Sequence, residues 1–192
     1  MRKMLLAIAK DIAGFFVSYA PVGCFLAGVV VLMCVLIMAY QRKGTGVDFG
    51  RASDVVKLRM RHILILFLLV FYLYVVLGIT ILSRNESPTR EISLELFRTF
   101  RNTFQARKQI YENIIMFIPF SVLLYMLAEP FRKLWISLTM GICGSLLIET
   151  TQWVTMTGHF ELDDILTNTI GMLIGYLGCM IVEKVVNRIK CK

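Results

Sequence analysis

Charged residues are scarce in this sequence: Asp, Glu, Lys and Arg make up 18% of its 192 residues, against about a quarter in an average soluble domain. The scarcity is also uneven, because residues 63–82 and residues 13–40 contain no charge at all. A helix rises about 1.5 Å per residue, so about 20 residues cross the roughly 30 Å hydrocarbon core of a bilayer. The composition therefore excludes an ordinary soluble domain and indicates membrane-spanning helices.

Three further apolar runs follow in the second half of the chain. Residues 113–128 and 165–182 are free of charge, and residues 134–158 contain only Glu149. Backbone groups must find partners within lipid, and the period-two alternation of a membrane barrel is missing, so each run is predicted to be a helix. We therefore expect an all-α polytopic membrane bundle of about five transmembrane helices, forming one compact domain in the cell membrane.

The sequence also lacks a CxxC pair, and four of its five cysteines fall inside the predicted helices. Such cysteines are typical small apolar packing residues. Neither a zinc site nor a disulfide framework is expected.

The N-terminal residues 1–12 carry Arg2, Lys3, Lys10 and Asp11 ahead of the first apolar run. A cleaved signal peptide is one interpretation, with the first two basic residues as its start. The other is an amphipathic lead-in at the membrane surface, followed by a retained helix. We favour the second, because charges interrupt the first stretch and the later run is far longer than a signal core.

The basic residues predict the orientation of the chain. With five spans, the 41–62 loop, the 132–133 turn and the 184–192 tail share one side and hold twelve of the 21 Lys and Arg residues. Because cytoplasmic loops collect positive charge, the C-terminus is predicted to be cytoplasmic. Membrane spans divide the basic residues, so nucleic acid is not an expected partner.

The loop at 83–110 contains an amphipathic pattern. Leu94, Phe97, Phe100 and Phe104 recur at spacings of three and four residues, with basic residues between them. This pattern is typical of a helix on an anionic membrane interface. It is equally consistent with a solvated connector whose aromatic side chains cover the ends of the spanning helices.

Polar residues inside the predicted spans need a reason, because a charged one costs about 2.5–3.5 kcal/mol on insertion. In the fourth helix, Glu149 and Gln152 are three residues apart and share a face with Gly141 and Ser145. The third helix contains Pro119, which bends a spanning helix and frees a carbonyl group. These features predict polar contacts between helices.

The fifth helix carries one continuous seam. Asp164, Asn168, Gly171, Gly175 and Gly178 follow the four-three spacing of a single helix face. The GxxxG pair favours close helix packing, and the acidic start of the helix suits its positive dipole end. The seam is therefore predicted to face a neighbouring helix.

The predicted topology brings several of these polar residues to one membrane face. Asn113, Glu149, Gln152 and Asp164 all fall near the ends of spans on that side, and the turn HFELDD at 159–164 would form a lid over them. The sequence therefore predicts a shared polar site.

Two ordered motifs carry a resemblance to a known family. ENIIMFIPF at 112–120 resembles the first motif of the VanZ family, an asparagine followed by a phenylalanine-any-proline element. ETTQ at 149–152 and ELDDILTNTIGMLIGY at 161–176 resemble the second. The likeness covers about residues 63–183, which implies a VanZ-like core of four helices plus an N-terminal helix. The chain departs from the family just before its acidic pair, where an arginine is common and this chain has Gly158 and His159.

The resemblance implies a role in low-level resistance to teicoplanin-type lipoglycopeptides in the envelope of Gram-positive bacteria. Four segments are expected: the lead-in at 1–12, the first transmembrane helix and basic cytoplasmic loop at 13–62, the VanZ-like membrane domain at 63–183, and the basic cytoplasmic tail at 184–192. The predicted ligand-binding or polar-core residues are Asn113, Glu149, Gln152, Glu161, Asp163, Asp164 and Asn168, and the predicted helix-packing residues are Pro119, Gly171, Gly175 and Gly178.

Two functions from different classes fit these residues. The first is a non-enzymatic protein without a cofactor, whose polar seam organises the bundle around a membrane lipid or a lipid-linked cell-wall precursor. The alternative is a Mg²⁺-dependent membrane enzyme acting on a phospholipid or polyprenyl-linked substrate. In it, Glu149, Asp163 and Asp164 would hold the metal, and His159 or Glu161 would transfer protons. The sequence contains neither a DDxxD string nor a phosphate-binding loop, and we therefore favour the first.

Overall fold

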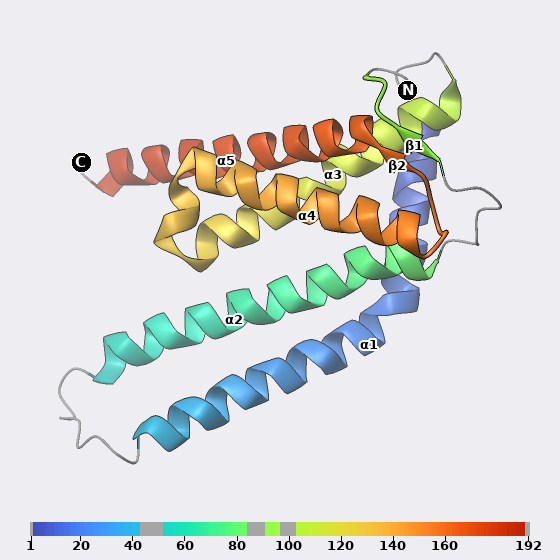
Figure 1. Cartoon of the computed structure of the whole chain (residues 1–192). Coiled ribbons are helices and arrows are strands. Elements are labelled where there is room, and N and C mark those ends of the chain that lie inside the picture. The colour runs from blue at the N-terminus through green and yellow to red at the C-terminus, as the bar shows by residue number, and fades with distance from the viewer. Residues whose placement is uncertain (1, 43–51, 84–90, 97–102, 191–192) are drawn as a thin grey trace.

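The computed structural model describes residues 2–42, 52–83, 91–96 and 103–190. Within them lie five helices long and apolar enough to cross a membrane, which confirms the predicted all-α polytopic bundle (Figure 1). The helices are α1 (Arg2–Arg42), α2 (Ala52–Leu77), α3 (Phe104–Leu127), α4 (Leu134–Val154) and α5 (Leu162–Lys190).

The helices form two groups (Figure 1). Helices α3, α4 and α5 pack together, with α3 and α5 running in the same direction and α4 antiparallel to both. Helices α1 and α2 form an antiparallel pair, and α2 contacts α3. A buried cluster of Leu69, Phe117, Leu124 and Met172 joins α2 to the larger group. Large apolar side chains such as Val17 and Phe25 are 79% and 69% exposed, as expected for surfaces that face lipid.

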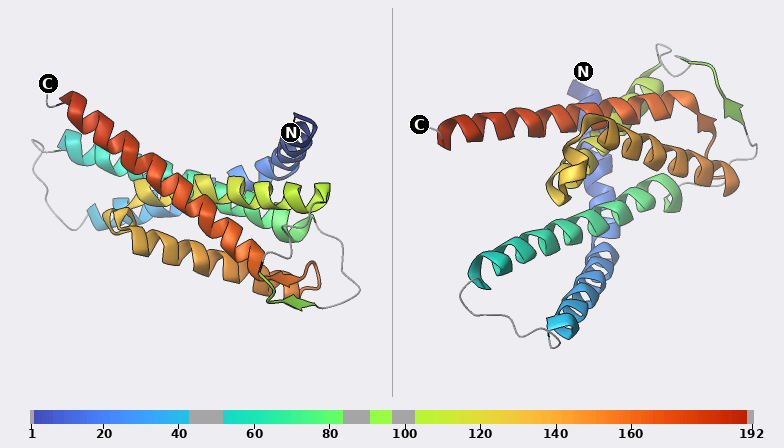
Figure 2. Two further views of the ribbon diagram at one scale, coloured as in Figure 1. Left: turned by 90° about the horizontal axis from the view of Figure 1, so that it is seen from above. Right: turned by 60° about the vertical axis from the view of Figure 1, so that its left-hand side comes forward.

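Two helices begin earlier than the apolar runs predicted. The lead-in expected at 1–12 belongs, from Arg2 onward, to the continuous helix α1, and its first turns project at an angle from the rest (Figure 2). Helix α2 begins at Ala52, inside the segment expected to be a loop. The apolar run therefore shows which part of each helix crosses the membrane. The helix itself begins earlier, among the charged residues that precede the run.

Helix α3 also begins early, at Phe104. Thr103 caps it by accepting a hydrogen bond from the backbone N–H of Ala106 at 3.3 Å. In the amphipathic pattern expected at 94–104, Leu94 is exposed and Phe104 starts α3, whereas Phe97 and Phe100 lie outside the described residues. With this cap, α3 begins about two and a half turns before its apolar run.

Helix α4 ends at Val154, four residues before the end of its predicted run. Met156 adopts a left-handed conformation with φ of 59°, and the N–H of Thr157 donates to the carbonyl of Gln152 at 3.0 Å. This is the hydrogen bond of a Schellman motif, which usually has glycine at the left-handed position. The motif turns the chain toward α5.

Short elements complete the fold. A π-helix, η2 (Gly78–Leu82), continues α2, and a 3-10 helix, η3 (Glu129–Arg132), joins α3 to α4. Strand β1 (Ile92–Ser93) pairs in parallel with β2 (Phe160–Glu161), with Ile92 opposite Phe160. This pairing was not predicted, and it ties the segment between α2 and α3 to the turn between α4 and α5.

Candidate functional site

Two glycines allow α5 to contact the backbone of α3. A Cβ atom built on Gly171 would lie 2.4 Å from the carbonyl oxygen of Ile114, and one on Gly175 would lie 2.6 Å from that of Ile118. Any larger residue would force the two helices apart. Gly178, expected in the same seam, is exposed and has no atom within 4 Å of an added Cβ, so it does not extend this contact.

Polar side chains join α3 to α5 at the start of both helices. The Gln109 amide nitrogen donates to both carboxylate oxygens of Asp164, at 3.1 and 3.0 Å. One turn further along, the Asn113 amide donates to the Thr167 hydroxyl at 3.3 Å. That hydroxyl donates in turn to the backbone carbonyl of Asp163 at 3.0 Å. The acidic start of α5 is therefore fixed against α3.

A second polar contact joins α4 to α5. The Asn168 amide nitrogen donates to the Ser145 hydroxyl at 2.8 Å, and both side chains are buried. Toward the turn, Glu149 is only 2% exposed and accepts a hydrogen bond from the backbone N–H of Glu161 at 2.9 Å. Glu149 thus holds the returning chain just before α5 begins.

A third contact joins α4 to the end of α2. The Gln152 amide nitrogen donates to the backbone carbonyl of Thr80 at 2.9 Å, and both residues are buried. Thr80 lies in the π-helix η2. Single π-helical turns occur frequently at functional sites.

These contacts converge on one end of the bundle, where α3 and α5 begin and α4 ends. We name this set the polar layer: Gln109, Asn113, Ser145, Glu149, Gln152, Asp163, Asp164, Thr167 and Asn168. The predicted Glu161 lies beside it in β2 and contributes its backbone N–H. Pro119 lies farther along α3 and lines a cavity. The polar layer links all the helices of the larger group to each other and to η2.

Three of the contacting residues were not predicted. Gln109 was placed in a loop because the expected third helix began later, although it lies one turn before Asn113. Thr167 directly precedes the predicted Asn168 in α5. Thr80 contributes only a backbone carbonyl to Gln152, and no side-chain pattern could have found it.

The carboxylates were also considered as metal ligands. Within the described parts of the chain, no group of three or more His, Cys, Asp or Glu side chains is placed to hold a metal ion. Glu149 accepts from a backbone N–H, and Asp164 accepts from Gln109. The described residues therefore contain no cluster of ligands for Mg²⁺, and Mg²⁺-dependent catalysis stays a prediction.

Comparison with known protein families finds a match for this sequence. The VanZ/LLP1 family model matches residues 61–183. The matched region includes most of α2, all of α3 and α4, and α5 as far as residue 183, and it leaves α1 outside. No curated protein and no solved structure matches the chain.

Proposed function

The chain belongs to the VanZ/LLP1 family, and we propose that this multi-pass membrane protein contributes to low-level resistance against teicoplanin-type lipoglycopeptides in the bacterial cell envelope. The observation that carries the proposed site is the burial of Glu149 and Asp164, which are 2% and 6% exposed, at one end of the bundle. An ionised group within a membrane span costs about 2.5–3.5 kcal/mol, so buried carboxylates in spanning helices commonly mark function.

The proposed mechanism is non-enzymatic. Glu149 orders the turn that leads into β2, and Asp164 orders the start of α5 against α3. The buried carboxylates therefore fix a polar surface at this end of the bundle, and its half-buried members Gln109 and Asn113 would contact a lipid headgroup or a lipid-linked cell-wall precursor. Contact with that surface would alter how the drug or its lipid-linked target is presented at the membrane.

Resistance assays with isosteric variants test this proposal. Glu149→Gln and Asp164→Asn each keep an oxygen that can accept the observed hydrogen bond but remove the negative charge. In a susceptible Gram-positive host, we expect either variant to lower the inhibitory concentration of a teicoplanin-type drug to that of cells carrying an empty vector. Immunoblotting of membranes establishes whether the variant protein accumulates normally.

Glu129→Gln is the matched control, because it removes an exposed carboxylate from η3 at the other end of α3. We expect this variant to protect cells as well as the natural sequence does. If Glu149→Gln and Asp164→Asn both accumulate normally and still protect cells, the charges of the polar layer have no part in resistance. If the natural chain itself gives no protection, the resistance role is wrong.

A further inference from the structure

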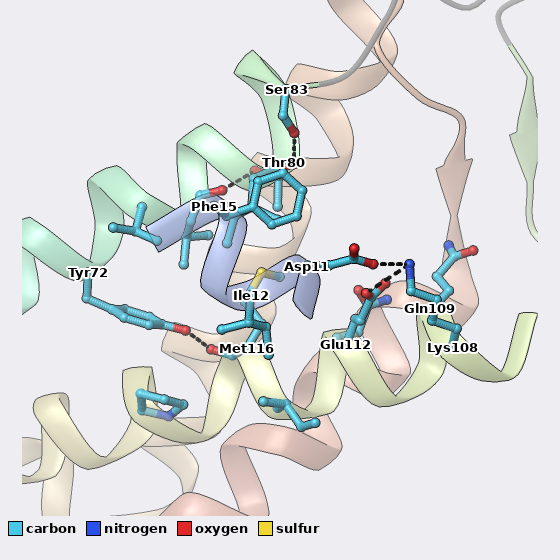
Figure 3. Close-up of a pocket in the computed structure, with 16 residues that line it drawn as sticks. Asp11, Ile12, Phe15, Tyr72, Thr80, Ser83, Lys108, Gln109, Glu112 and Met116 are labelled. Atoms are coloured by element: carbon cyan, nitrogen blue, oxygen red, sulfur yellow. Dashed lines mark hydrogen bonds and ion pairs between the residues drawn. The ribbon is translucent and has the colours of Figure 1, made fainter. Parts of the chain in front are cut away.

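A cavity of about 400 Å³ lies between α1, α2 and α3 (Figure 3). Much of its wall is apolar, with Phe15 from α1, Val76 and Ile79 from the α2–η2 segment, and Met116 from α3. Helix α1 lies outside the region that the family shares, so one side of this cavity is built by a part of the chain that the family match does not include. The cavity shares Gln109 and Asn113 with the polar layer, but the proposed resistance role does not depend on a ligand inside it.

Three charged side chains gather at the polar end of the cavity (Figure 3). The Lys108 ammonium lies 2.5 Å from a carboxylate oxygen of Asp11 and 3.4 Å from one of Glu112. Of the charged residues that line the cavity, two are therefore acidic and one is basic. The three side chains are 21–39% exposed, which leaves them accessible from the cavity.

The other polar groups of the wall present acceptors. The Ser83 and Thr80 hydroxyl groups each donate a hydrogen bond to a carbonyl of their own helix at 2.8 Å. Their single hydrogens are used, and their oxygen lone pairs remain as acceptors. The amide nitrogens of Gln109 and Asn113 donate to α5, and their amide oxygens are further acceptors. A ligand that complements this wall is therefore a hydrogen-bond donor with a positive charge.

We propose that the cavity binds a membrane phospholipid whose headgroup carries a primary ammonium group. The ammonium supplies three donors and a positive charge to Asp11 and Glu112, and charge-assisted hydrogen bonds of this kind are among the stronger ones. An acyl chain lies along the apolar wall toward Tyr72 and Pro119. The volume is at the lower end of the roughly 300–1,000 Å³ usual for ligand pockets, and it accommodates a headgroup and part of one chain.

Native mass spectrometry of the purified full-length protein in detergent tests the proposal. The probes are phosphatidylethanolamine and phosphatidylglycerol with identical acyl chains, so they differ only in the headgroup. We expect phosphatidylethanolamine to bind the natural chain with about tenfold higher affinity, as charge complementarity requires. The double variant Asp11→Asn/Glu112→Gln should lose this preference, whereas Glu129→Gln should keep it.

A second variant tests the apolar wall. Ile79→Trp places a bulky ring in the cavity and should reduce binding of both phospholipids about tenfold, since it fills volume that the acyl chain needs. Equal affinity for the two lipids in the natural chain, or an unchanged preference in the charge-removed variant, would overturn the ammonium assignment. Glycerophosphoethanolamine has the same headgroup but lacks acyl chains. If it competed as well as phosphatidylethanolamine does, a soluble amine would be the ligand and the lipid assignment would be wrong.

Discussion

At the scale of single residues, Asn168 represents the chemistry of the polar layer. It is 2% exposed, its amide nitrogen donates to Ser145, and its side-chain oxygen is buried without a hydrogen-bond partner in the described structure. Hydrogen bonds between helices in a bilayer contribute about 0.6 kcal/mol on average and up to about 1.7 kcal/mol, because the unfolded helices also find partners there. The contact is therefore modest in energy and serves mainly to specify which faces of α4 and α5 meet.

A double-mutant cycle measures this contact. We expect Asn168→Ala and Ser145→Ala each to lower the free energy of unfolding in mixed micelles, because each leaves its buried partner unpaired. Together they should cost less than the sum of the two, by a coupling energy of about 0.6 kcal/mol and at most about 1.7 kcal/mol. Strictly additive effects would mean that the two side chains do not interact within the membrane.

The cost of burying polar groups explains which residues the sequence could predict. Glu149 and Gln152 interrupt an apolar run and Asp164 directly precedes another, so each required a reason, and the structure gives each of the three a hydrogen-bond partner. Their partners are often backbone groups, such as the N–H of Glu161 and the carbonyl of Thr80. Backbone groups are the same at every position, so the sequence carries no signal for them.

At the scale of helices and strands, the apolar runs with one charge or none located all five spans but not their ends. The ends depend on local caps: Thr103 begins α3 early, and the left-handed Met156 ends α4 before the apolar run does. Strand β1 has two residues, too few for a period to appear. The GxxxG pair predicted a close contact, but spacing on one helix does not identify its partner, and the partner is α3.

The glycines of α5 allow a matched test of that contact. Gly175→Leu places a side chain where the carbonyl oxygen of Ile118 would lie 2.6 Å from its Cβ, and overpacking of this kind costs about 1–3 kcal/mol or more. We expect the level of this variant in membranes to fall severalfold. Gly178→Leu makes the same substitution three residues later in open space and should accumulate normally. Similar levels of both variants would contradict the packing of α5 on α3.

At the scale of the whole molecule, the fold gives the two ends of the bundle different characters. One end holds the polar layer, the β1–β2 pair and the Asp11–Lys108 ion pair. At the other end, Arg132 forms an ion pair with Glu183 at 3.0 Å, close to the basic C-terminal turns of α5. A bundle can insert in either direction, and its orientation depends on the basic residues of the loops.

Cysteine labelling in intact cells decides the orientation. Leu94 is 66% exposed beside β1, and Glu129 is exposed in η3 at the opposite end. In a variant with the five natural cysteines replaced, we expect Leu94→Cys to react with a membrane-impermeant maleimide in intact cells. Glu129→Cys should react only after the cells are opened, because the distribution of basic residues predicts that this end lies in the cytoplasm. The reverse pattern would place the polar layer and the ammonium-binding cavity at the cytoplasmic face, where a drug acting outside the cell could not meet them directly.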